Sequence, residues 1–160
     1  MVTLNKITAE QVWQLLATVT DPEVPVLTIL DLGIVQAVNI LNNQIEIVIT
    51  PTYTGCPAMD MIAINIQLAM ATIGITAVKI TTVLSPAWTT DWMTEAGKQK
   101  LKAYGIAAPN KKISIPIDGV ECPRCQATQT KLLSEFGSTA CKALYQCSNC
   151  MEPFDYFKCH

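Results

Sequence analysis

The chain contains a single histidine, His160, and a single arginine, Arg124, among its 160 residues. A Ser–His–Asp arrangement is therefore excluded over most of the chain, because that chemistry needs an imidazole base beside the nucleophile. Only 15% of the residues are charged and the net charge is −2. The basic stripe that is typical of nucleic-acid-binding proteins is missing, so we expect no nucleic-acid partner.

Long apolar runs are also missing. The most apolar stretch, residues 61–73, carries Asn65 and Gln67 and is shorter than the roughly 20 residues that span a bilayer. Residues 1–6 lack the apolar core of a secretion signal. We therefore expect a cytoplasmic protein without a membrane segment. In such a protein, seven cysteines favour metal or thiol chemistry over disulfides.

Two motifs of redox enzymes are absent from the sequence. It contains no Gly-x-Gly-x-x-Gly, the fingerprint of a flavin or nicotinamide nucleotide site. It also contains no Glu-x-x-His, the pair from which helical di-iron sites are built. These absences argue against an oxygenase or a nucleotide-dependent oxidoreductase.

The sequence does contain two Cys-x-x-Cys pairs, Cys122 with Cys125 and Cys147 with Cys150. Each pair can reach one ion from a tight turn, and two pairs supply a tetrahedral all-sulfur site. Such a site suits zinc, with iron as the alternative, and four ligands leave no open position for catalysis. The competing interpretation is four unrelated thiols. Glycine often follows the second cysteine of such knuckles, whereas Gln126 and Met151 stand there.

Three further residues could add ligands to this site: Cys141, Cys159 and His160. Cys141 precedes an apolar strand pattern, so core packing is its alternative role. Cys159 and His160 are the last residues of the given sequence. They could bind metal transiently or belong to a disordered tail.

The pattern before residue 110 predicts helices over 8–19, 57–73 and 90–104 and strands over 34–40, 45–50 and 77–84. The helix at 57–73 is apolar nearly all round, so we expect it to be buried. Strand, helix and strand joined by short links imply a parallel pair beside the hairpin. The predicted fold is α/β (α+β). A small mixed β-sheet with helices occupies residues 1–109, and a four-cysteine zinc ribbon occupies 110–160.

A second candidate site lies at the start of the helix predicted over 57–73. Pro57 suits the first helical position and places Cys56 at the cap. Free amides and the positive helix end favour thiolate over thiol there, although Cys56 could equally be a small buried apolar residue. Asp21, Glu23 and Asp31 belong to an acidic loop expected near the same sheet edge, and turn formation is the alternative role of Asp21 and Asp31.

Four ordered segments then stand out: DPEVP (21–25), DLGIV (31–35), TPTYTGCP (50–57) and SPAW (85–88). They resemble the domain shared by iron–sulfur cluster assembly factors. Two later segments, 133–145 and 152–160, resemble the D subunits of bacterial phenylacetyl-CoA oxygenases (ring epoxidases), the PaaD family. The two resemblances together cover nearly the whole chain.

The resemblance implies an accessory role in aerobic phenylacetate degradation. The chain would mature or maintain the metal centres of the oxygenase and reductase subunits, and those subunits or the iron–sulfur assembly machinery would be its partners. The reactive cysteine of the family falls on Cys56, as a carrier of iron or an iron–sulfur cluster. The acidic motif residues fall on Asp21, Glu23 and Asp31. We expect no catalytic activity of the chain's own.

Two other functions stay open from the sequence. The chain could be a structural or electron-transfer component of the oxygenase complex that docks through its ribbon, or a thiol enzyme that uses Cys56. Its apolar sheet and its hydrophobic content of 50% are compatible with a homodimer.

Overall fold

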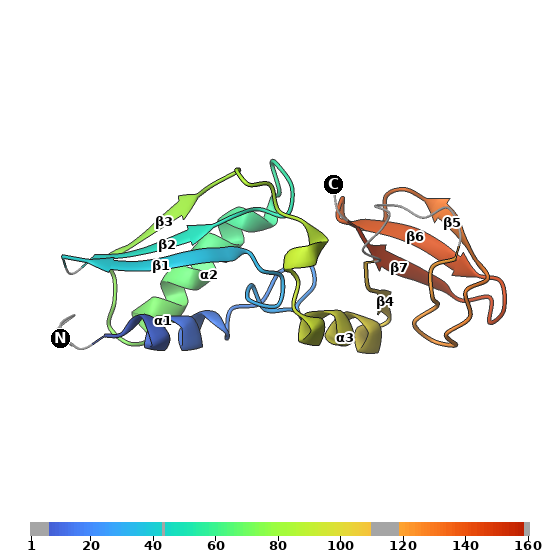
Figure 1. Ribbon diagram of the computed structural model, residues 1–160, viewed down its shortest axis with the longest axis horizontal. Coiled ribbons are helices and arrows are strands. Elements are labelled where there is room, and N and C mark those ends of the chain that lie inside the picture. Colours follow the sequence, from blue (N-terminus) through green and yellow to red (C-terminus); the bar gives the residue numbers. More distant parts are fainter. Residues whose placement is uncertain (1–6, 43, 110–118, 159–160) are drawn as a thin grey trace. The chain divides into compact units, whose positions relative to one another are not determined.

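The computed structural model describes residues 7–42, 44–109 and 119–158 (Figure 1). The chain forms two compact units, residues 1–88 and residues 89–160. The domain boundary that we predict between residues 109 and 110 lies at the edge of the undescribed segment 110–118 and stays a prediction. Among the described residues, no helix is long and apolar enough to cross a membrane.

The first unit contains the predicted small mixed sheet, which is confirmed. Its strands are β1 (Val35–Leu41), β2 (Gln44–Ile49) and β3 (Val78–Thr82), in the order β1-β2-β3. β1 and β2 are antiparallel, and Asn42 in the turn between them has a positive φ of 47°, which asparagine tolerates well. β2 and β3 are parallel, because the intervening helix returns the chain to the starting edge.

Two helices, α1 (Ala9–Leu16) and α2 (Ala58–Ala71), lie against this sheet (Figure 1). α1 begins with a capping box in which the hydroxyl of Thr8 accepts from the backbone of Gln11 while the side chain of Gln11 accepts from the backbone of Thr8. α1 ends at Leu16, three residues before the predicted end. The buried core between helices and sheet includes Val12, Leu16, Ile45, Ile47, Ile49, Ile62, Ile66 and Met70.

The prediction that α2 is buried all round is wrong. Ala58, Ile62, Ile66 and Met70 are buried, at the spacing of one helix face. Met61, Ile64 and Leu68 lie three and four residues apart on another face of the helix, and these residues are 48%, 48% and 61% exposed. A three-stranded sheet offers a single apolar packing surface to this helix, so only one face of α2 finds a partner within the described part of the unit.

The second unit begins with a short 3₁₀ helix, η2 (Thr90–Trp92), and helix α3 (Glu95–Tyr104). The single helix predicted over 90–104 is therefore interrupted. Met93 is extended, with a ψ of 138°, and the hydroxyl of Thr94 accepts a hydrogen bond from Gly97 N at 3.0 Å. Thr94 thus caps a new helix instead of continuing the first.

A four-stranded sheet follows, in the order β4-β7-β6-β5. Its strands are β4 (Ile106–Ala107), β5 (Thr130–Ser134), β6 (Lys142–Cys147) and β7 (Pro153–Phe157). β6 pairs antiparallel with both β5 and β7, whereas β4 adds to β7 in parallel.

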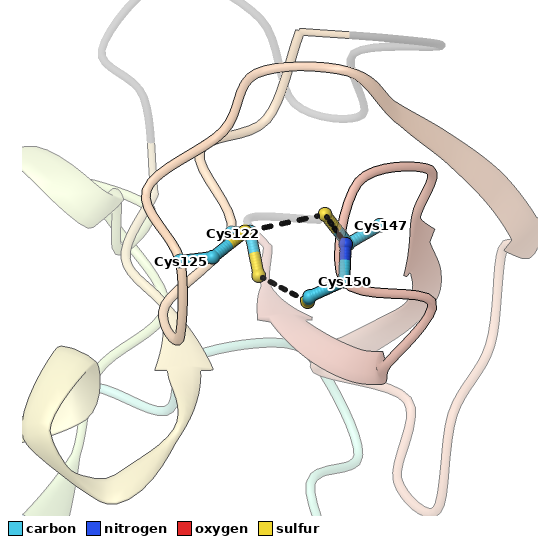
Figure 2. A group of neighbouring side chains, drawn as sticks. All are labelled: Cys122, Cys125, Cys147 and Cys150. Carbon is cyan, nitrogen blue, oxygen red and sulfur yellow. Dashed lines mark hydrogen bonds between the residues drawn. The ribbon is translucent and has the colours of Figure 1, made fainter.

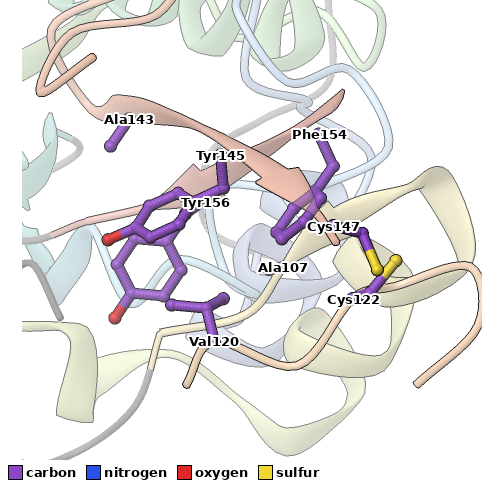
Figure 3. Close-up of a cluster of buried hydrophobic side chains, with 8 residues drawn as sticks. All are labelled: Ala107, Val120, Cys122, Ala143, Tyr145, Cys147, Phe154 and Tyr156. Carbon is purple, nitrogen blue, oxygen red and sulfur yellow. The ribbon is translucent and has the colours of Figure 1, made fainter. Parts of the chain in front are cut away.

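The core of this unit is aromatic and continues into the cysteine site (Figure 3). Tyr145 stacks on Phe154 with ring centroids 5.9 Å apart and meets Tyr156 edge-on at 5.6 Å. Cys122 and Cys147 belong to the same buried cluster and are fully inaccessible. Two of the four candidate ligands are therefore also core side chains.

The two faces of α2 predict that the same change, isoleucine to alanine, has different effects on stability at a buried and at an exposed position. We expect Ile66→Ala to lower the free energy of unfolding by about 2–5 kcal/mol, because it leaves a cavity in the core. Ile64→Ala, on the exposed face of the same helix, is the matched control and should change it by less than about 0.5 kcal/mol. Urea unfolding followed by circular dichroism measures both, and equal effects would contradict the one-sided burial of α2.

Candidate metal centre

The structure brings the four cysteines of the two Cys-x-x-Cys pairs together (Figure 2). Their sulfur atoms all lie within 4.8 Å of one another. Cys122 Sγ and Cys150 Sγ are 3.8 Å apart, and Cys125 Sγ and Cys147 Sγ are 3.5 Å apart. Zinc–sulfur bonds of about 2.3 Å in a tetrahedron place sulfurs roughly 3.8 Å apart. The donor set therefore fits one zinc-sized ion.

Each pair belongs to a knuckle that the backbone closes in the same way. Cys122 N donates to Ala127 O at 2.9 Å, and Cys147 N donates to Glu152 O at 3.0 Å, so both loops span the same number of residues. The residue after the second cysteine, Gln126 or Met151, has a φ of 64° in each knuckle. Gln126 and Met151 thus adopt the left-handed backbone conformation for which glycine is usually used, although both have a Cβ.

The sheet of the second unit carries the two knuckles to one point. Cys147 is the last residue of β6, and its register partner is Thr130 at the start of β5. Ser148 N also donates to Gln129 O at 2.7 Å. The second knuckle connects β6 to β7, and the first precedes β5. Pairing of β5 with β6 therefore fixes how the knuckles approach each other.

Hydrogen bonds from nitrogen atoms surround the sulfurs. Cys147 Sγ accepts from Asn149 N at 3.3 Å and from Cys150 N at 3.5 Å. Cys125 Sγ accepts from the side-chain Nδ2 of Asn149 at 3.6 Å. Donors of this kind stabilise thiolate over thiol, so the knuckles are built for charged sulfur.

The surroundings of Cys125 and Cys150 shift the pKa values of these two thiols in opposite directions. Hydrogen bonds from the Ala127 backbone and then the Asn149 side chain lower the pKa of Cys125 to about 6. For Cys150 the largest single influence, a hydrogen bond from the Glu152 backbone, also favours the thiolate. Burial and the neighbouring thiols outweigh it and raise the pKa of Cys150 to about 12. A bound dication would offset the repulsion between neighbouring thiolates, because each thiolate would then face positive charge.

The three additional candidate ligands are not part of this group. Cys141 precedes β6, whereas Cys147 ends it, which separates them by about 20 Å of strand. Cys141 is buried, and its sulfur lies 3.1 Å from the Thr139 hydroxyl. Cys159 and His160 lie outside the described residues.

Cys56 lies in the loop between β2 and α2 and is half-buried. Its N–H donates to Tyr53 O at 3.2 Å, and its carbonyl accepts from Met59 N at the same distance. Pro57 is the N-cap of α2 and makes no side-chain capping bond. Cys56 therefore stands one residue before the cap rather than at it.

Two of the three acidic residues of the predicted second site, Asp21 and Asp31, stabilise turns. Asp21 Oδ1 accepts from Glu23 N and Val24 N, both at 2.8 Å, and Asp31 Oδ2 accepts from Thr28 N at 3.0 Å. Within the described ranges, the four ribbon cysteines form the sole group of three or more potential ligands with ligand atoms this close. Cys56, Asp21, Glu23 and Asp31 do not form a comparable group there.

Two residues near the sites, Thr50 and Asn149, are not among the predicted site residues. Thr50, at the start of the Cys56 loop, is buried, and its hydroxyl has no hydrogen-bond partner in the described part of the chain. Asn149 contacts sulfurs of both knuckles. Its position between the two cysteines of a knuckle is a signal that the sequence does contain, since residues inside a metal-binding turn lie close to the sulfurs.

Comparisons with known proteins cover both parts of the chain. The family model described as the PaaD zinc beta ribbon domain matches residues 107–158, and the model described as an iron–sulfur cluster assembly protein matches residues 9–82. An Escherichia coli K12 protein, named "Putative 1,2-phenylacetyl-CoA epoxidase" and designated its D subunit, is 51% identical over 152 residues. That alignment spans 93% of this chain and 92% of the relative. The chain belongs to the PaaD family.

Shorter proteins resemble part of this PaaD-family chain. A Porphyromonas gingivalis protein named "Fe-S protein maturation auxiliary factor" is 32% identical over 96 residues, which cover 59% of this chain and 90% of that protein. The crystal structure of a domain of unknown function from Bacillus anthracis matches with a TM-score of 0.53 and 27% identity, over 57% of this chain and 89% of that one. A conserved hypothetical protein of Thermotoga maritima matches with a TM-score of 0.52 and 29% identity, over 63% and 98%.

The left-handed residues of the knuckles yield a stability prediction. We expect Gln126→Gly and Met151→Gly each to stabilise the metal-loaded chain by about 0.5–1 kcal/mol. Relief of a left-handed conformation is worth about 1–2 kcal/mol, and glycine's added chain entropy offsets part of it. Ser148→Gly, at a knuckle position without positive φ, should destabilise instead. Thermal unfolding at saturating zinc measures all three, and a loss of stability in both knuckle variants would contradict the argument.

Proposed function

We propose that this chain is an accessory protein of the phenylacetyl-CoA ring-epoxidising oxygenase system in aerobic phenylacetate degradation. Its role is to mature or maintain the iron or iron–sulfur centres of partner subunits, without catalytic activity of its own. One observation carries the proposal. The chain combines a match to an iron–sulfur cluster assembly model over residues 9–82 with 51% identity to a protein named as part of an epoxidase.

In this proposal the four ribbon cysteines, Cys122, Cys125, Cys147 and Cys150, hold one structural zinc. Their sulfur separations support this, and so does the all-sulfur donor set. The ion would neutralise the thiolates and join the knuckle before β5 to the knuckle between β6 and β7. Four protein ligands close the coordination sphere, so the ribbon stabilises the second unit and offers no open position for chemistry.

Cys56 is the residue we propose to carry the cargo, an iron ion or an iron–sulfur unit in transit to a client. It is a half-buried cysteine in a loop at the end of β2, outside the ribbon site. Thiolates are the preferred protein ligands of iron–sulfur clusters. Asp21, Glu23 and Asp31 would shape the neighbouring acidic loop through the turns that Asp21 and Asp31 hold.

A second candidate function is that of a structural or electron-transfer component within the oxygenase complex. The naming of the Escherichia coli relative as one of the epoxidase subunits favours it. Under this alternative the chain co-purifies with the catalytic subunits in fixed stoichiometry. Under the maturation proposal the contact is transient and substoichiometric.

The zinc site predicts a specific loss of metal. Wild-type protein should contain about one zinc per monomer by elemental analysis. Cys122→Ser should lose that zinc and unfold the second unit, because a small ribbon has too little core without its ion. Cys141→Ser is the matched control, a buried cysteine outside the site, and should keep the zinc. Stoichiometric metal in a Cys122→Ser, Cys147→Ser double variant would refute the site.

The maturation role predicts the phenotype of Cys56→Ala in cells that grow on phenylacetate. The oxygenase and reductase polypeptides should be made but be poor in iron and nearly inactive, because the delivering thiolate is gone while the ribbon still folds. Chemical reconstitution of their metal centres should restore phenylacetyl-CoA turnover without this chain. Cys141→Ala, which removes a cysteine elsewhere, should leave the iron content of the partners unchanged.

Turnover by fully metallated partner subunits, with and without the chain, separates the two candidate functions. The maturation proposal expects equal rates. An absolute requirement for the chain in every turnover would refute it and favour the structural or electron-transfer alternative.

A further inference from the structure

Asn149 donates hydrogen bonds from nitrogen to a sulfur in each knuckle. Its backbone N–H reaches Cys147 Sγ of its own knuckle at 3.3 Å, and its side-chain Nδ2 reaches Cys125 Sγ of the other knuckle at 3.6 Å. These two sulfurs are themselves 3.5 Å apart. We propose that Asn149 is a positioning residue of the metal centre, which ties Cys125 to the second knuckle and strengthens metal binding.

The physical reason lies in the repulsion between the sulfurs. Cys125 and Cys147 form the closer of the two sulfur pairs given above, and both become thiolates when they bind metal. Asn149 donates its backbone N–H to Cys147 and its side-chain amide to Cys125. These neutral donors spread part of the negative charge of the sulfurs without adding charge of their own. Groups that hydrogen-bond metal ligands in this way typically contribute about 10–100-fold to metal affinity.

The side chain also joins parts of the chain that are distant in sequence. The other nitrogen donors described for these sulfurs are backbone N–H groups of the same knuckle. The Asn149 side chain instead links residues 24 positions apart. It therefore limits the positions that Cys125 can take relative to Cys147. Less conformational entropy is then lost when the metal binds.

A purely local role for Asn149 makes different predictions. Asparagine is favoured in turns for conformational reasons, and in that role aspartate would replace it well. Asn149→Asp keeps the shape and the turn preference but removes the N–H donor and places a carboxylate beside thiolates. Asn149 is exposed, so neither this variant nor Asn149→Ala removes core packing.

The inference rests on the proposed zinc site, and the experiment separates the two. Zinc affinity of the full chain is measured by competition with a chromophoric chelator. We expect Asn149→Ala to bind zinc about 10–100-fold more weakly than wild type, and Asn149→Asp to bind at least as weakly as Asn149→Ala. Two controls should stay within about twofold of wild type. Ser148→Ala changes an exposed neighbour in the same turn, and Gln146→Ala removes an amide that donates to the carbonyl of Met151 at 3.2 Å rather than to sulfur.

The absorption spectrum of the cobalt-substituted protein is a second measurement, and it should not change if Asn149 only stabilises the turn. Thiolate-to-cobalt charge-transfer bands depend on the charge density of the sulfurs, so loss of the amide donor should shift them to lower energy in both Asn149 variants. The bands should stay in place in Ser148→Ala and Gln146→Ala.

Each outcome decides one of the two proposals. If wild-type protein takes up neither zinc nor cobalt, the four-cysteine site itself is refuted. If wild type binds and Asn149→Asp matches it in affinity and spectrum, the site stands and the role of Asn149 is refuted. Variants that stay unfolded at saturating zinc would also refute it, because Asn149 would then act in turn formation.

Discussion

Mutual repulsion of four closely spaced sulfurs is the constraint on which the second unit depends. The sulfurs lie within 4.8 Å of one another, and thiolates this close repel one another unless a cation binds them. The sheet still holds them together, because Cys147 ends β6 and pairs with the start of β5. Strand pairing thus sets the separation of the knuckles, and an ion would convert the repulsion into attraction.

The features that the sequence predicts well are those encoded by local spacing. Two Cys-x-x-Cys pairs predict a four-sulfur group, and alternating apolar residues joined by short links predict the mixed sheet. Other features depend on what each element meets in space. The exposed face of α2 depends on how many layers cover the helix, which its uniform apolarity does not reveal. The link from Asn149 to Cys125 depends on how two turns approach each other, and no local pattern contains that information.

Two smaller differences have local causes that the sequence only partly reveals. Thr94 interrupts the helix predicted over 90–104, because a threonine hydroxyl that accepts from Gly97 N favours a new helix start over continuation. Gln126 and Met151 keep the left-handed turn although they are not glycine. In the first case a local capping bond outweighs the helical pattern, and in the second the knuckle imposes a conformation that the residue type disfavours.

Cys122 and Cys147 belong at once to the sulfur group and to the aromatic core around Tyr145. With zinc bound there, folding of the second unit and metal binding are one linked equilibrium. At a free zinc concentration 100 times the dissociation constant, binding adds about 2.7 kcal/mol to the stability of the folded state. The folded fraction of the ribbon would then rise and fall with the zinc supply of the cell. The amount of chain able to bind a partner that recognises the folded ribbon would change with it.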